Sequence, residues 1–260
     1  MVEKALALAD LDVAILDLED GVPAAEKDNA RRIVAAVLEG TRDRAATRRF
    51  VRVSRPGSPD HLADLAAIGH RADGVVLSKV ERPEEVADLV RRLSEVAVIA
   101  AIESARGLLA ASAIATTSPA FLLGLMFGAE DFANDLGLPP GLDAAAREML
   151  YARSAIVVAA AASGVDAFDA VWTDIADLDG LRRDAESARR LGFRGKSVIH
   201  PSHVAVVNEV FSPRPDELAW ARRVVEAAQR AEREGRAAIA LDGQLVDPPV
   251  VARARRTLGT

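Results

Sequence analysis

The chain has 260 residues, of which 50% are hydrophobic and 28% charged, and this balance excludes an intrinsically disordered protein. The formal net charge of -6 provides no basic field for nucleic acid, and no apolar run approaches the roughly 20 residues of a transmembrane helix. Cysteine is absent, which excludes disulfides, thiol catalysis and zinc–thiolate sites and agrees with a reducing compartment. We therefore expect a soluble, cytoplasmic, globular protein that binds neither nucleic acid nor membranes.

Short apolar runs alternate with longer helical patterns along most of the chain. The runs typical of buried strands lie at 13–20, 48–57, 74–80, 96–104, 121–131, 169–175 and 195–201. Apolar residues at helical spacing lie between them, at 24–38, 61–69, 83–93, 141–163 and 179–191. Near-continuous apolar strands separated by amphipathic helices predict an α/β fold with a parallel sheet covered by helices.

The number of strands favours a (β/α)8 barrel of the TIM type, although only about seven strands are visible and a closed barrel needs eight. The alternative is an open doubly wound sheet, but no strand is followed by a G-x-G-x-x-G turn. The pattern changes after Phe211, where one long helix ending near Gly235 precedes an appendage. We therefore divide the chain into a catalytic barrel, 1–210, and a C-terminal helix and arm, 211–260, that packs on a neighbouring subunit.

Polar residues stand where the apolar runs end, which is where the active site of a parallel barrel lies. Carboxylates dominate this set, which comprises Asp17, Glu19, Asp20, Arg52, Arg55, Lys79, Glu103, Glu130, Asp131, Asp174 and His200. Oxygen ligands of this kind suit a hard cation such as Mg2+, which one or two carboxylates hold together with substrate and water. The pattern indicates a carboxylate–metal lyase or aldolase.

Several of these residues also have simpler interpretations. Acids at strand ends, such as Asp131, often cap the next helix, and capping with ion pairing is the favoured interpretation of Asp17. Lys79 ends a clear apolar strand and could form a Schiff base in a metal-independent aldolase, whereas a salt bridge is its commoner role. His200 and His203 are spaced like a metal pair, but a His-Pro turn beside a strand more often serves local hydrogen bonding.

Seven segments, in order along almost the whole chain, resemble the citrate lyase beta-subunit-like family of the HpcH/HpaI aldolase and CoA-ester lyase superfamily. They are ILDLEDGV (15–22), VRVSRPG (51–57), LSKVE (77–81), AAIESARG (100–107), GAEDFANDLG (128–137), GFRGKSVIHPSHVAVVNEVFSP (192–213) and LDGQLVDPPV (241–250). The resemblance implies a (β/α)8 barrel with a C-terminal helical extension, assembled as a trimer or hexamer. It also implies cleavage of a carbon–carbon bond in 3-hydroxy-acyl thioesters such as malyl-CoA, citramalyl-CoA or a citryl thioester.

The resemblance assigns the central chemistry to four residues. Glu103 and Asp131 look like the two protein ligands of Mg2+, and Arg52 resembles the arginine that contacts the substrate near its thioester. Asp247 matches an aspartate that reaches into a neighbouring subunit's site as an acid or base. By this analogy Mg2+ would chelate the hydroxyl and carboxylate of the substrate, and Arg52 would stabilise the enolate of acetyl-CoA. Asp247 would then protonate the enolate carbon.

Five further residues take supporting roles in the same resemblance. Lys4, aligned with an offset of one residue, resembles a lysine that binds CoA. Ser197 and Val198 match the backbone segment beside the bound thioester. Glu19 and Asp20 look like residues that orient Arg52 and the water on the metal.

The chain departs from this family at its beginning, because relatives usually start with a strand before the helix that opens this chain. Loss of that strand explains the count of seven, and we expect that the start codon was assigned too late. A free-standing CoA lyase that releases an α-keto acid and acetyl-CoA is the favoured function. The alternatives are the beta subunit of a citrate lyase complex, acting on an acyl-carrier-protein thioester, and a Schiff-base aldolase using Lys79.

Overall fold

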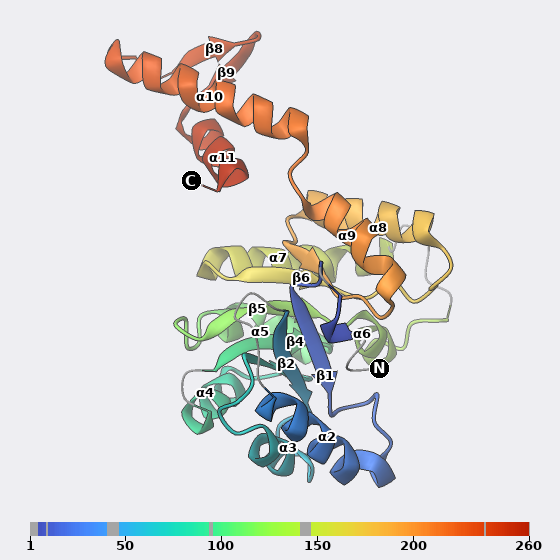
Figure 1. The fold of residues 1–260 in the computed structure, drawn as a ribbon. Helices are drawn as coiled ribbons and strands as arrows, with labels where there is room; N and C mark the ends of the chain where they lie inside the picture. Colours follow the sequence, from blue (N-terminus) through green and yellow to red (C-terminus); the bar gives the residue numbers. More distant parts are fainter. Residues whose placement is uncertain are drawn as a thin grey trace. The chain divides into compact units, whose positions relative to one another are not determined.

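A computed structural model describes residues 5–8, 10–40, 47–93, 96–140, 147–236 and 238–259 (Figure 1). The chain divides into two units, Met1–Phe211 and Ser212–Thr260, and each is described here by itself. Among the described helices, none combines the length and the apolar character needed to cross a bilayer.

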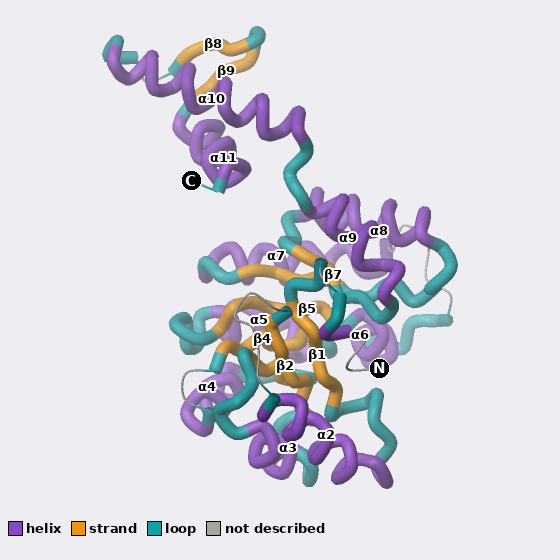
Figure 2. The backbone as a smooth tube through the Cα atoms, in the orientation of Figure 1, coloured by secondary structure: helices purple, strands orange, loops and turns teal. Residues whose placement is uncertain are grey.

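The first unit is built on a parallel sheet of seven strands. These are β1 (Val13–Asp17), β2 (Arg48–Val53), β3 (Gly74–Leu77), β4 (Ala97–Ile102), β5 (Leu122–Phe127), β6 (Asp166–Asp169) and β7 (Gly195–Lys196). Every strand pairs with the one before it in sequence, so the spatial order is the chain order. The sheet is curled and helices lie around it (Figure 2), which confirms the predicted α/β fold. Within the described residues no pairing joins β7 to β1.

The connections between the strands are mostly helical. They are η1 (Ala24–Glu26), α2 (Lys27–Glu39), α3 (His61–Ile68), α4 (Pro83–Arg92), α5 (Ala105–Ala115), α6 (Ala129–Asp135), η2 (Arg147–Met149), α7 (Leu150–Ser163) and α8 (Leu178–Leu191). A further helix, α9 (Pro201–Phe211), follows the last strand. Local sequence explains several of the ends. Pro83 occupies the first turn of α4, where its missing N–H costs nothing, and Ser104 caps α5 by accepting a hydrogen bond from the Gly107 amide.

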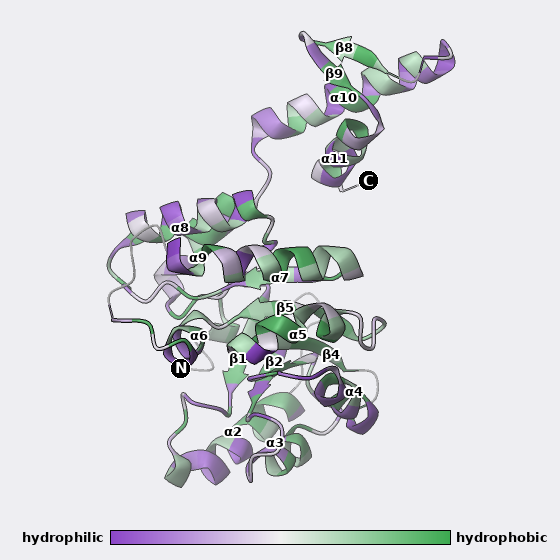
Figure 3. Cartoon of the chain, turned by 180° about the vertical axis from the view of Figure 1, so that it is seen from behind, coloured by the Kyte–Doolittle hydropathy of each residue, from purple (hydrophilic) through white to green (hydrophobic). Residues whose placement is uncertain are grey.

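Both faces of the sheet carry buried apolar side chains, which explains why its strands are almost continuously apolar, and Ile15 of β1 and Leu123 of β5 are exposed exceptions. Alternate residues of one strand serve opposite faces, since Val75 and Leu77 join the large core while Val76 joins a smaller cluster. The smaller cluster also contains Phe50, whose ring lies so close to Gly74 that any Cβ at position 74 would overlap it. Hydrophobic residues are accordingly concentrated on the strands and on α7 (Figure 3).

Three of the predicted boundaries are displaced in the structure. The sixth strand was expected at 169–175 but runs from Asp166 to Asp169, because the left-handed Gly164 ends α7 only two residues earlier. The seventh strand contains Gly195–Lys196 alone rather than 195–201. The apolar run 121–131 ends as a strand at Phe127, and α6 begins at Ala129.

The second unit contains a helix, a hairpin and a further helix: α10 (Pro215–Arg233), β8 (Ile239–Leu241), β9 (Gln244–Val246) and α11 (Pro248–Leu258). Asp242 and Gly243 join the two strands with positive φ angles of 52° and 75°, the conformation that a two-residue Asp-Gly hairpin turn requires. Ala221, Val224, Val246 and Ala254 form its small core.

Candidate active site at the carboxyl ends of the strands

The structure gathers most of the predicted site residues at one edge of the parallel sheet. Glu19 and Asp20 follow β1, Arg52 lies in β2, Lys79 follows β3, Glu103 follows β4, and Asp131 lies in the first turn of α6 after β5. Parallel strands end at the same edge, so residues far apart in the sequence meet there. Ion pairs connect Glu19, Asp20, Arg52, Lys79 and Asp131.

Glu103 is buried, with 7% of its surface exposed. Its Oε2 atom is buried and accepts no hydrogen bond from any residue that the structure describes. Burial, reinforced by the negative charges of Glu19 and Asp131, raises the pKa of Glu103 to about 7. The carboxylate packs against Gly128, where a Cβ would lie 2.5 Å from Glu103 Cγ, so this position demands a glycine.

Lys79 places its ammonium between the acids. Its Nζ atom lies 2.6 Å from Asp20 Oδ2, 3.0 Å from Glu19 Oε1 and 3.6 Å from Asp131 Oδ1. Burial opposes the charge, but the hydrogen bonds that the ammonium donates to Asp20 and Glu19 outweigh it and raise the pKa of Lys79 above its ordinary value. A lysine held in its charged form is a poor nucleophile, so the geometry favours the salt-bridge interpretation over the Schiff base.

Arg52 is held in a fixed orientation by Asp17. Its Nε and Nη2 atoms donate to the two carboxylate oxygens at 2.8 and 2.6 Å, and Nη1 lies 3.4 Å from Glu19 Oε2. Burial alone would raise the pKa of Asp17, but the Arg52 guanidinium and the amides of Glu19 and Gly21 lower it below its usual value. Asp17 thus makes the ion pair that its sequence position suggested, but it caps no helix: the amides that it accepts belong to the turn after β1, and the next helical element begins only at Ala24.

One supporting residue gave no signal in the sequence. Lys27 begins α2, and its Nζ atom donates to the backbone carbonyls of Leu18 and Glu19 at 2.6 and 2.9 Å. This clamps the turn that carries Glu19 and Asp20. Lysine at a helix start is ordinarily a solvent-exposed residue, so only the folded loop reveals its role.

The donor set of this cluster is suited to a divalent cation. Five carboxylates (Asp17, Glu19, Asp20, Glu103 and Asp131) stand against the two cations Arg52 and Lys79, which leaves an excess of negative charge. Among the described residues, no three His, Cys, Asp or Glu side chains meet closely enough to hold an ion by themselves. Mg2+ normally takes one or two carboxylates and fills its other positions with substrate and water, so Glu103 and Asp131 fit it.

The remaining predicted residues lie outside this ion-pair network. Ser197 and Val198 follow β7 at the same edge of the sheet, where the Ser197 amide donates to Asp169 O at 3.0 Å. Asp247 lies in the second unit, where its carboxylate caps α11 by accepting from the Val250 amide at 3.3 Å. Lys4 lies outside the residues that the structure describes.

His200 makes the local hydrogen bond that its simpler interpretation suggested, whereas His203 contacts a carbonyl far from it in the sequence. His200 Nδ1 lies 2.7 Å from Ser202 Oγ. His203 is buried, and its Nε2 atom lies 3.3 Å from Ile175 O.

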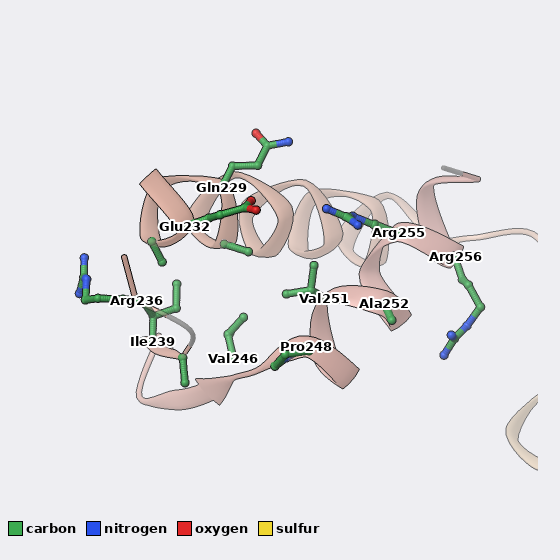
Figure 4. A pocket seen from close by; sticks show the side chains of 13 residues that line it. Gln229, Glu232, Arg236, Ile239, Val246, Pro248, Val251, Ala252, Arg255 and Arg256 are labelled. Carbon is green, nitrogen blue, oxygen red and sulfur yellow. The ribbon is translucent and has the colours of Figure 1, made fainter. Parts of the chain in front are cut away.

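The helices and the hairpin of the C-terminal residues also enclose a hollow. It belongs to the second unit, holds about 610 Å³, and is walled by side chains such as Ile239, Val246 and Val251, with Glu232 and Arg236 at its margin (Figure 4). Glu232 is the single acid among its described lining residues.

Comparison with known proteins decides the family. Residues 1–201 match HpcH/HpaI aldolase/citrate lyase. The chain belongs to this family. The predicted family and the predicted class of activity, a carbon–carbon lyase, are confirmed.

Relatives within the HpcH/HpaI aldolase/citrate lyase family cover nearly the whole chain. A citrate lyase subunit beta-like protein of Mycobacterium tuberculosis is 41% identical over 98% of this chain and 89% of its own length. The mitochondrial citramalyl-CoA lyase of Rattus norvegicus is 34% identical over 96% of this chain and 80% of its own length. The crystal structure of the M. tuberculosis protein CitE in complex with magnesium, acetoacetate and coenzyme A superposes with a TM-score of 0.80. It is 38% identical, over 97% of this chain and 91% of that one.

Proposed function

We propose that this protein is a Mg2+-dependent lyase that cleaves a 3-hydroxy-acyl-CoA thioester of the citramalyl-CoA or malyl-CoA type. The products would be an α-keto acid and acetyl-CoA. The observation that carries the proposal is the pair Glu103 and Asp131. These two acids lie in a negatively charged cluster, close to the Arg52 guanidinium that Asp17 holds in place. It is supported by the relative that is a citramalyl-CoA lyase and by the similar structure that holds magnesium and coenzyme A.

Glu103 and Asp131 would hold the ion. Bound there, Mg2+ supplies Lewis acidity toward the hydroxyl and carboxylate oxygens of the substrate and orients the bond that breaks. Glu19 and Asp20 would keep the surrounding groups in place, since both bind Lys79 and Glu19 also faces Arg52. Lys27 in turn holds the turn on which they stand.

Arg52 would stabilise the charge that develops on the thioester oxygen. A base would take the proton of the substrate hydroxyl, whose oxygen becomes the carbonyl of the α-keto acid. The carbon–carbon bond then breaks, and its electron pair passes into the enolate of acetyl-CoA. A permanently charged guanidinium suits this role, because its two contacts to Asp17 fix it before the charge appears. About a third of the Arg52 side chain is exposed, so part of it remains available to a substrate.

The same proposal assigns roles to residues outside the acid cluster. Asp247 would reach the site from a neighbouring subunit of a trimer or hexamer and protonate the enolate carbon. The arm 211–260 would pack on that neighbour. Lys4 and the backbone at Ser197 and Val198 would bind the CoA thioester. We propose further that the curled sheet of the barrel unit, 1–210, works as part of an eight-stranded (β/α)8 barrel.

The test is release of α-keto acid from (S)-citramalyl-CoA and malyl-CoA by protein stripped with EDTA, before and after Mg2+ is added. We expect activity only with the metal, and the faster substrate identifies the acyl group. Asp131→Ala should abolish this turnover without unfolding the protein, because much of the Asp131 side chain is exposed. Glu130→Ala changes the adjacent, exposed acid and is the matched control. Full activity in Asp131→Ala would reject the metal assignment.

A second candidate is the beta subunit of a citrate lyase complex, which the name of the M. tuberculosis relative favours. It predicts turnover of a citryl thioester on an acyl-carrier protein and none of free CoA esters. The same assay distinguishes it when both thioesters are offered to the Mg2+-loaded protein.

A further inference from the structure

Four charged side chains form a buried network that the proposed mechanism does not use. Arg153 of α7 donates to both oxygens of Asp169 at 3.1 and 2.8 Å and lies 3.1 Å from Asp184 Oδ1. Lys196 Nζ lies 2.8 Å from Asp169 Oδ2 and 2.5 Å from Asp184 Oδ2. The exposed fractions of the four side chains range from 1% to 10%.

The network lies at the edge of the sheet that carries the proposed site. Asp169 is the last residue of β6 and Lys196 the last of β7, and the two are register partners. Ser197 follows directly, donates its amide to Asp169 O, and places its Oγ atom 3.5 Å from Met126 Sδ on β5. The segment 197–199 is therefore attached to the network at its first residue, through the peptide bond to Lys196 and the hydrogen bond to Asp169.

β7 is too short to hold this segment by strand pairing alone. It contains two residues, and its pairing with β6 comprises Phe168 with Gly195 and Asp169 with Lys196. The Lys196 side chain adds ties to β6 and, through Asp184, to α8. Burying two cations and two anions costs free energy, and apolar residues could fill the same space. A network of this kind therefore fixes the positions of its elements more than it stabilises the fold.

We propose that Lys196 and Asp169 are positioning residues that hold the 197–199 segment where it lines the thioester half of the substrate. This inference rests on the proposed function, because it assumes that the strand-end site takes an acyl-CoA. It predicts a selective defect. Loosening the segment should weaken use of the CoA substrate, while the metal site at Glu103 and Asp131, which follow β4 and β5, stays intact.

The main variant is the double substitution Lys196→Met with Asp184→Asn. It removes one cation and one anion together, so Arg153 and Asp169 remain a balanced pair and the protein does not bury an uncompensated charge. Asp169→Asn is the second variant, and it breaks the network from the β6 side. Arg194→Met is the matched control, because Arg194 lies beside β7 in the same segment but makes only an exposed pair with Asp166 at 3.5 Å.

Three quantities are measured on each protein, after circular dichroism and thermal melting have established that it is folded at the assay temperature. They are the KM for acetyl-CoA and the KM for the keto acid in the condensation direction, and the Mg2+ dissociation constant by calorimetry. We expect the double variant to raise the KM for acetyl-CoA by about tenfold or more, with the other two quantities unchanged. Asp169→Asn should do the same, and Arg194→Met should match the wild type.

The inference is overturned if the folded double variant equals Arg194→Met, or if all three quantities shift together, since a general loosening of the fold would cause the latter. Failure of the proposed function looks different. In that case the wild-type protein itself would bind no acetyl-CoA and turn over no CoA thioester, before any variant is compared.

Discussion

Glu103 is unusual because its carboxyl group has a pKa near neutral pH. Because its pKa is raised from 4.5 to about 7, the folded protein without metal binds a proton more readily than the unfolded chain. The stabilisation is complete below about pH 4.5 and is lost as pH rises through 7. We therefore expect metal-free wild-type protein to lose stability relative to Glu103→Gln between pH 5 and pH 8, by on the order of 3 kcal/mol. Urea unfolding in EDTA at the two pH values measures this difference.

The same proton competes with the metal. Binding of Mg2+ to an ionised Glu103 should release a proton at pH 6.5 and very little at pH 8.5. Calorimetry in buffers of different ionisation enthalpy counts the protons released. Equal release at both pH values would contradict the assignment of Glu103 as a ligand.

At the scale of single residues, the sequence predicted which side chains meet but not how they are held. Glu103, Asp131 and Arg52 could be found because each stands at the end of an apolar run, and the ends of parallel strands share an edge. The clamp made by Lys27 could not be found, because its partners are backbone carbonyls nine and eight residues earlier. Which carbonyls a turn presents depends on its folded shape and not on side-chain identity.

At the scale of elements, the junction between β5 and α6 limits the space around Glu103. Gly128 stands between these elements, and a Cβ there would lie 2.5 Å from Glu103 Cγ and 2.8 Å from Oε1. Its φ of -107° is accessible to any residue, so alanine would cause a clash and not backbone strain. We expect Gly128→Ala to weaken Mg2+ binding by about tenfold or more by displacing Glu103.

Calorimetric titration of Gly128→Ala with Mg2+ measures this effect. Gly137→Ala is the comparison, because Gly137 has a left-handed φ of 65° and no atom near its Cβ position. That substitution should lower stability and leave the metal affinity unchanged. A variant at position 128 that binds Mg2+ like the wild type would show that the carboxylate adjusts freely.

The ends of elements could be predicted where residues within one turn determine them. The prediction was wrong where the end of a strand depends on which residues the rest of the fold covers. Pro83 and Ser104 mark helix starts by chemistry that lies within one turn. The segment 170–175 contains Val171 and Trp172 and resembles a strand, yet β6 ends at Asp169. Apolar character alone does not distinguish a residue that pairs in the sheet from one that covers its edge.

At the scale of the whole molecule, the proposed sharing of sites between subunits has a quantitative consequence. Arg52→Ala and Asp247→Asn should each be inactive. The first lacks the guanidinium that the barrel supplies, and the second lacks the carboxylate that the arm supplies. When the two are co-expressed in equal amounts, about one quarter of the sites should combine an intact Arg52 with a neighbour's intact Asp247. Recovery of activity in the mixed oligomer, measured as keto-acid release, checks this expectation.

The choice of asparagine at position 247 separates chemistry from folding. Asp247 caps α11, and asparagine caps a helix as well as aspartate does, so Asp247→Asn should melt like the wild type. Asp247→Ala should lose about 1 kcal/mol of stability in addition to its activity. No recovery in the mixture of two folded, inactive variants would place Asp247 in the site of its own subunit or outside catalysis.

The order of the strands also bears on how the protein is made. Each strand from β2 to β7 pairs with the strand immediately before it, so its partner has already left the ribosome when it emerges. The entropy lost in closing each of these loops is therefore small. We expect the sheet to grow strand by strand during translation, so a nascent chain halted after α7 would already protect β1 to β5 from protease.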